Sequence, residues 1–135
     1  MTSPLKLGDK MPDIYLGEFL EDSTKKMKVS DLKGSLVILD FWETWCSSCI
    51  AAMPKMDSLQ KEFGNRIKII LVTRNDRAKV SAIFKKGNIR RPDLPLVIND
   101  SFLRKLFPYN TVPHHVWIDQ NGIVKFITDG YNATG

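Results

Sequence analysis

The stretch of sequence that decides the fold is FWETWCSSC, residues 41–49. It begins at the end of a nearly continuous apolar run over residues 36–42, which is typical of a strand buried on both faces. From Cys49 onward, apolar residues recur every three or four positions as far as Phe63, which predicts an amphipathic helix. The only two cysteines of the chain, Cys46 and Cys49, therefore lie where the predicted strand meets the predicted helix.

The spacing of these cysteines indicates redox chemistry. Two thiols one helical turn apart can close a disulfide with little backbone movement. The unpaired N–H groups and the dipole of a helix N-terminus stabilise a thiolate, and such settings lower a cysteine pKa to roughly 3.5–7.5. Cys46, nearer the helix tip, is predicted to be the exposed nucleophile, and Cys49 the thiol that resolves a mixed disulfide. A static disulfide or two inert thiols is the alternative interpretation.

The rest of the chain predicts an α/β fold whose sheet has parallel and antiparallel parts. Gly64 ends the first helix, and Pro54 lies inside it and should kink it. Asn121-Gly122 between two apolar runs is a strong hairpin signal. The predicted strands cover residues 14–16, 27–29, 36–42, 67–73, 94–98, 116–118 and 123–126. The predicted helices run from 49 to 63, from a cap at 75 or 76 to 87, and from 99–101 to 107.

Composition narrows the class of protein. At 135 residues, with 43% hydrophobic and 26% charged residues, the chain fits one domain, residues 1–135, which could be a fragment of a longer protein. No apolar run approaches the roughly 18–20 residues of a membrane span, and the N-terminus has no signal-peptide core. The net charge of +5 is spread in small groups among acids, so we expect no nucleic-acid partner. Two cysteines exclude a disulfide scaffold and a four-thiolate zinc site.

Residues 41–49 resemble the thioredoxin active-site segment, especially that of the TlpA/ResA-type thiol-disulfide oxidoreductases. The resemblance spans roughly residues 7–130. Residues 7–13 resemble the opening segment of that branch, residues 111–113 its cis-proline loop, and residues 117–122 its final hairpin. It implies a thioredoxin-like fold, with a central mixed sheet flanked by helices and an N-terminal hairpin. The family's last helix has no candidate sequence here, so we expect the C-terminal helix to be missing.

The same resemblance implies roles for residues around the cysteines. Asp40 matches the buried acid of thioredoxins, and a carboxyl in an apolar strand can serve as a proton relay for Cys49. Capping of nearby backbone groups is its alternative role. A cis Pro113 would expose the backbone of Val112 for pairing with an extended substrate. Trp45 is expected to shield the site or, alternatively, to pack in the core.

Four residues depart from the family's pattern, namely Glu43, Ser48, His114 and His115. Ser48 replaces a frequent proline, and its hydroxyl can donate to a thiolate. Glu43 stands where a small residue is usual, so it either disfavours the Cys46 thiolate or points to solvent. His114 follows the proline, where it either lies near Cys46 and modulates its charge or is a strand histidine with no catalytic role.

Together these features predict an enzyme that exchanges disulfides with protein substrates, with no cofactor or metal beyond the Cys46–Cys49 pair. The resemblance favours a monomeric reductant, supplied by an upstream electron donor, in an extracytoplasmic compartment such as the bacterial periplasm. Its leader would be absent from this chain, and a cytoplasmic location is the alternative. A copper(I) chaperone using both cysteines and His114 is the competing function, although copper carriers of this fold usually separate the cysteines by three residues. The peroxidase pattern of Thr, Pro and Arg around a cysteine is missing.

Overall fold

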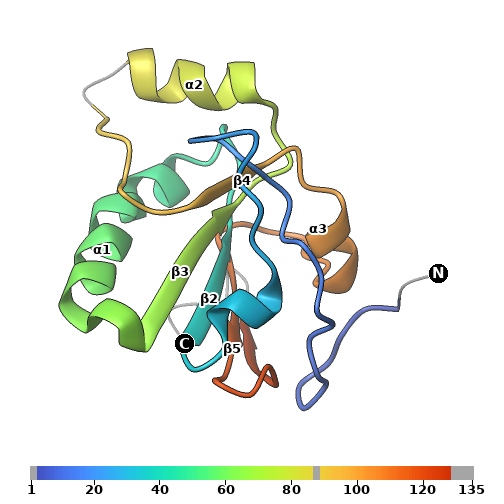
Figure 1. Cartoon of the computed structure of the whole chain (residues 1–135). Helices are drawn as coiled ribbons and strands as arrows, with labels where there is room; N and C mark the ends of the chain where they lie inside the picture. Colours follow the sequence, from blue (N-terminus) through green and yellow to red (C-terminus); the bar gives the residue numbers. More distant parts are fainter. Residues whose placement is uncertain (1–2, 87–88, 129–135) are drawn as a thin grey trace.

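A six-stranded mixed sheet organises the computed structural model, which describes residues 3–86 and 89–128 (Figure 1). The strand order is β1-β4-β3-β2-β5-β6. The strands are β1 (Glu18–Phe19), β2 (Leu36–Phe41), β3 (Ile67–Val72), β4 (Leu96–Ile98), β5 (His114–Ile118) and β6 (Val124–Thr128). The helices are α1 (Ser47–Phe63), α2 (Arg77–Lys86) and α3 (Phe102–Leu106), with short 3₁₀ turns at Val29–Leu32 and Gly64–Arg66.

The pairing of the strands confirms the mixed sheet. β2, β3 and β4 run parallel, whereas β5 and β6 continue the sheet antiparallel to β2, and β1 pairs antiparallel with β4. β2 lies between β3 and β5, so both of its edges are hydrogen-bonded and it forms the centre of the sheet. A strand in this position needs apolar residues on both faces, which is why residues 36–42 form a nearly continuous apolar run.

Side chains of β2 alternate between two cores. Leu39 and Phe41 pack with α3 on one face, and Ile38 packs with α1 and α2 on the other. Figure 1 shows α1 and α3 on opposite sides of the sheet. The alternation places Asp40 on the α1 face, the same face as the two cysteines.

Capping residues fix where the helices begin and end. α1 ends at Gly64, whose positive φ of 57° is a conformation that glycine adopts readily. Of the two predicted caps for α2, Asp76 is the one that accepts the N–H of Lys79, at 2.9 Å. Asp100 accepts the N–H groups of Leu103 and Arg104 at the start of α3, and its burial raises its pKa.

The N-terminal region differs from the predicted hairpin. Residues 14–16 and 27–29 meet only at one antiparallel bridge, between Tyr15 and Lys28, because Val29 already begins a 3₁₀ turn. The strand that joins the sheet is β1, only two residues long, which no periodicity could reveal. The predicted end of α2 at residue 87 and the missing C-terminal helix lie outside the described residues.

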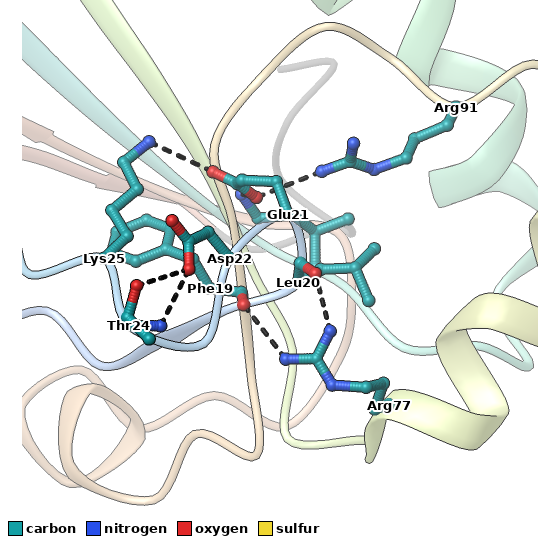
Figure 2. A network of polar contacts seen from close by, with 9 residues as sticks. Phe19, Leu20, Glu21, Asp22, Thr24, Lys25, Arg77 and Arg91 are labelled. Atoms are coloured by element: carbon teal, nitrogen blue, oxygen red, sulfur yellow. Dashed lines mark hydrogen bonds and ion pairs between the residues drawn. The ribbon is translucent and has the colours of Figure 1, made fainter.

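Polar contacts fasten the β1 region to the start of α2 (Figure 2). The guanidinium of Arg77 donates to the carbonyl oxygens of Leu20 at 2.6 Å and Phe19 at 3.1 Å. Glu21 accepts from Arg91 at 3.0 Å, which ties the same segment to the loop before β4. These side-chain contacts hold the backbone after β1 in place, where it makes few hydrogen bonds to neighbouring strands.

Candidate active site

The two cysteines lie at the end of β2 and the start of α1. Cys46 is the N-cap residue of α1, and its Sγ accepts the backbone N–H of Cys49 at 3.2 Å. The two form a disulfide with a Cα–Cα distance of 5.3 Å. Each residue is only 5% exposed, so the prediction that Cys46 is exposed is wrong for the disulfide form, in which both sulfurs pack in the same apolar cluster. The Cys46 sulfur thus occupies the point of the helix terminus where a negative charge is stabilised.

A loop from a distant part of the chain faces Cys46. The carbonyl oxygen of Val112 lies 3.8 Å from Cys46 Sγ, and the Val112–Pro113 peptide bond is cis, as the resemblance implied. On the helix side, the hydroxyl oxygen of Ser48 lies 3.5 Å from the same sulfur. Cys46 is therefore bordered by two groups that can hydrogen-bond to a partner or to the sulfur itself.

Glu43 is a buried residue of the loop between β2 and α1, three positions before Cys46. One carboxylate oxygen accepts the indole N–H of Trp45 at 2.8 Å and the Nε–H of Arg74 at 3.0 Å, and the other accepts the hydroxyl of Tyr109 at 3.4 Å. The residue is 4% exposed, so its carboxylate does not point to solvent. Trp45 is 68% exposed beside Cys46, which differs from core packing.

A further hydrogen bond joins the same loop to the connection between β3 and α2. The side-chain oxygen of Asn75 accepts the backbone N–H of Thr44 at 2.9 Å. Arg74 and Asn75 therefore bind consecutive residues of the loop that precedes Cys46. This explains why Asn75 does not cap α2.

Tyr109 is held protonated by its surroundings. Burial, followed by the negative charge of Glu43, raises the pKa of Tyr109 to about 12. The neutral phenol can then donate its hydrogen to the Glu43 carboxylate over the whole physiological range.

The raised pKa of Tyr109 predicts a loss of stability in alkali. Folding favours the protonated phenol, so this contribution is complete below the ordinary pKa of about 10 and is lost as the pH rises toward 12. In Tyr109→Phe, the free energy of unfolding should fall less between about pH 9.5 and 11.5 than in the wild type. Urea denaturation at each pH measures it. Tyr15→Phe, at a 57% exposed tyrosine, is the control, and equal slopes in wild type and Tyr109→Phe would refute the prediction.

Asp40 and His115 form a pair on the α1 face of the sheet. They are directly opposite each other in the β2–β5 ladder, and His115 Nε2 lies 3.3 Å from an oxygen of Asp40. His114 points to the other face, where its ring packs near Phe41 and Tyr109 at centroid distances of 5.7 and 5.5 Å. The structure thus separates the two adjacent histidines by the thickness of the sheet.

Sequence reasoning missed three residues of this site, namely Arg74, Tyr109 and His115. The charge of Glu43 within an apolar segment indicates that a hydrogen-bonding partner should exist, but the sequence does not identify that partner. For His115, the signal would have been the strand register, since one position of slippage exchanges the faces of the two histidines.

The described residues lack two features that other functions would require. Within residues 3–86 and 89–128, no group of three or more His, Cys, Asp or Glu side chains is arranged to hold a metal ion. In that part of the chain, no helix has the length and apolarity that a membrane crossing requires.

Comparison with known proteins decides the family. The model of the AhpC/TSA family matches residues 7–127, which is most of the chain. The chain belongs to the AhpC/TSA family. It is 32% identical to the thiol-disulfide oxidoreductase ResA of Geobacillus kaustophilus over 126 residues, covering 92% of this chain and 70% of that protein.

Solved structures extend the likeness to the fold. A structure described as the thiol:disulfide interchange protein DsbE of Chlorobium tepidum is similar with a TM-score of 0.77 and 25% identity, covering 96% of this chain and 89% of that one. The exposed lipoprotein thioredoxin Etrx1 of Streptococcus pneumoniae is similar with a TM-score of 0.73 and 26% identity, covering 88% and 90%. The predicted thioredoxin-like fold is confirmed, and with the disulfide-bonded Cys46–Cys49 pair the protein is a thiol-disulfide oxidoreductase.

Proposed function

We propose that the protein reduces disulfides of protein substrates, with Cys46 as nucleophile and Cys49 as resolving thiol. The observation that carries this assignment is the position of Cys46 Sγ, which accepts the Cys49 N–H at the start of α1 and faces the Val112 carbonyl. A thiolate at this sulfur gains the stabilisation of the helix terminus, whereas Cys49 lies one turn inside the helix.

The proposed reaction transfers two electrons in two exchanges. The Cys46 thiolate attacks one sulfur of the substrate disulfide, so a mixed disulfide forms and the other substrate sulfur leaves as a thiolate. Cys49 then attacks Cys46 Sγ after losing its proton, which closes the Cys46–Cys49 disulfide and releases the second substrate thiol. An upstream donor of two electrons and two protons must return the pair to the dithiol.

Asp40 is proposed to accept the Cys49 proton. It is buried on the α1 face, between Ile38 and Trp42 along the chain, and these two side chains pack in the same cluster as both cysteines. A carboxyl buried on the same face of the sheet as both cysteines can accept a thiol proton, and this position supports a role in proton transfer.

The surface around Cys46 is proposed to bind an extended segment of the substrate. The Val112 carbonyl lies close to Cys46 Sγ and can accept a backbone N–H, while Pro113 shapes the loop. The exposed indole of Trp45 offers apolar contact beside the reacting sulfur. Backbone pairing of this kind does not depend on the side chains of the substrate.

We further propose an extracytoplasmic location and a monomeric state. The location is supported by the similarity to a pneumococcal protein whose description names it an exposed lipoprotein. The copper(I) alternative gains no support, since His114 lies on the face of the sheet opposite the cluster that contains the cysteines.

The equilibrium reduction potential of the Cys46–Cys49 pair tests the proposed direction. In a glutathione redox series, a reductant should have a potential near that of thioredoxin, about −270 mV. A potential near about −120 mV, typical of a strong oxidant, would overturn the direction while leaving disulfide exchange intact. Reduction of insulin by the dithiol form should accompany the low potential.

A further inference from the structure

We propose that His115 takes the proton that Asp40 has received from Cys49 and releases it to solvent. Because His115 acts only through Asp40, it is a positioning residue and does not touch the reacting sulfurs. The proposal rests on the proposed function, because it deepens the role given there to Asp40. It assigns a task to a histidine that lies outside the cysteine motif and that the reaction scheme above does not use.

His115 and Asp40 are held together by the sheet itself. His115 Nε2 lies 3.3 Å from Asp40 Oδ1, and the two residues are directly opposite each other on adjacent antiparallel strands. Opposed side chains in such a ladder share a face and stay close. The backbone of two central strands therefore maintains the pair, rather than a flexible loop.

The two members of the pair differ in exposure. The Asp40 side chain is 8% exposed and the His115 side chain 20% exposed. Asp40 is thus the inner member, toward the cluster with Cys49, and His115 the outer one. A proton that leaves Asp40 toward His115 moves from the core toward water.

Among the described residues, the face of β5 and β6 beyond His115 carries exposed side chains. Two aromatic residues on the same face of β5 and β6, Trp117 and Phe126, pack edge-to-face at 5.7 Å and remain 38% and 47% exposed. Among the described residues, this part of the sheet is therefore not covered as β2 and β3 are. His115 lies at the border between the covered and the open part.

Among the described residues, few ionisable groups face the Asp40–His115 pair. On β3, the residue opposite Asp40 is Leu71, and on β6 the residue opposite His115 is Thr128, so neither neighbouring strand adds an ionisable side chain there. From α1 and its N-cap, the buried side chains of the adjoining cluster are the two cysteines and Met53, and the partly buried ones packed against it are all apolar. Among residues 3–86 and 89–128, the ionisable groups that these neighbouring elements place around the path are therefore the thiols, Asp40 and His115.

Protons and electrons balance in the proposed transfer. When Cys49 attacks Cys46 Sγ of the mixed disulfide, the Cys49 S–H proton moves to the Asp40 carboxylate and the substrate sulfur leaves with the electron pair. Asp40 passes the proton to neutral His115, and the imidazolium releases it to water. In re-reduction of the Cys46–Cys49 disulfide by the upstream dithiol donor, the proton returns by the same groups in reverse.

The test follows the two thiolate releases when the reduced full chain reacts with Ellman's reagent. The first release reports attack by Cys46, and the second reports attack by Cys49 on the mixed disulfide. In His115→Gln, the second rate at neutral pH should fall about tenfold, below the ~10²–10⁴ of a direct general base. The pH profile of the second rate should lose its inflection between about pH 5 and 8, the range in which imidazoles titrate. The first rate should stay within about twofold of the wild-type value.

Further variants separate proton transfer from structure. Trp117→Phe changes the same strand and face without removing an ionisable group, so both rates should remain. Asp40→Asn should slow the second release more than His115→Gln, and the double variant no further, because both act in one path. Added imidazole should restore the rate of His115→Ala but not that of Asp40→Asn, and His115→Asn serves if His115→Ala does not fold.

The outcomes distinguish the role of His115 from the function itself. Two releases with unchanged rates and pH profile in His115→Gln would overturn the role of His115 and leave the exchange reaction standing. Additive effects of the Asp40 and His115 variants would also overturn it. If the wild-type dithiol gave no second release at all, the proposed function would fail, since Cys49 would not resolve the mixed disulfide.

Discussion

Cys46→Ser should reduce turnover to the uncatalysed background, because no thiolate remains to attack the substrate disulfide. A serine hydroxyl at the same N-cap can accept the Cys49 N–H, so the start of α1 should survive the change. Loss of activity would then reflect chemistry rather than unfolding. Insulin reduction with an excess of dithiol reductant measures turnover, and thermal unfolding of the same sample verifies the fold.

Cys49→Ser is the matched variant, and its expected behaviour is different in kind. Cys46 can still attack, but nothing resolves the product, so mixed disulfides with partner proteins should accumulate and be visible on non-reducing gels. The order of the roles would be refuted if Cys46→Ser trapped partners and Cys49→Ser did not. Faster alkylation of Cys49 than of Cys46 in the reduced protein near neutral pH would have the same consequence.

The parts of the fold that the sequence predicts well share a physical cause. β2 and α1 are long elements whose burial requires a pattern of apolar residues. The strand is buried on both faces and needs a continuous apolar run, and the helix is buried on one face and needs an apolar residue every three or four positions. Both patterns are present in the sequence. The junction between these two patterns is enough to place Cys46 and Cys49 at the start of a helix. The resemblance adds the loop at Val112, which no local pattern assigns to the site.

The parts that were not predicted depend on contacts between distant segments. β1 is two residues long, and its pairing with β4 depends on residues about 80 positions away, so it leaves no periodic signal. The two partners of Glu43 that are distant in sequence come from positions 74 and 109, on two separate loops. The choice between His114 and His115 depends on the register of β5 against β2, because alternate residues of a strand face opposite sides.

Glu43→Ala should cost the protein about 2–3 kcal/mol of folding stability, because the donors of Trp45, Arg74 and Tyr109 lose one common buried acceptor. This loss lies at the lower end for a broken ion pair, since the Arg74 side chain is 47% exposed and can be hydrated instead. The melting temperature should fall by roughly 5–12 °C for a domain of this size. Calorimetry and urea denaturation of the oxidised form measure the change.

Glu43→Gln is the matched control, because an amide oxygen of the same shape can still accept from Trp45 and Arg74. Its stability loss should be about half that of Glu43→Ala or less. A double-mutant cycle with Arg74→Met should show that the two residues are coupled. Equal stability of wild type and Glu43→Ala would refute the view that this carboxylate holds the loop in place.

The same variant separates the structural role of Glu43 from its electrostatic one. Removing the negative charge should lower the pKa of Tyr109 from about 12, since that charge is the second cause of its shift after burial. It should also let the Cys46 thiol ionise at lower pH, by less than about one unit, because the Arg74 guanidinium 3.0 Å away already offsets the carboxylate. Tyrosinate and thiolate absorbance in the ultraviolet follow the two titrations. A Tyr109 titration that moves while the Cys46 titration does not would show that Glu43 acts on the loop's shape and leaves the reactivity of the sulfur unchanged.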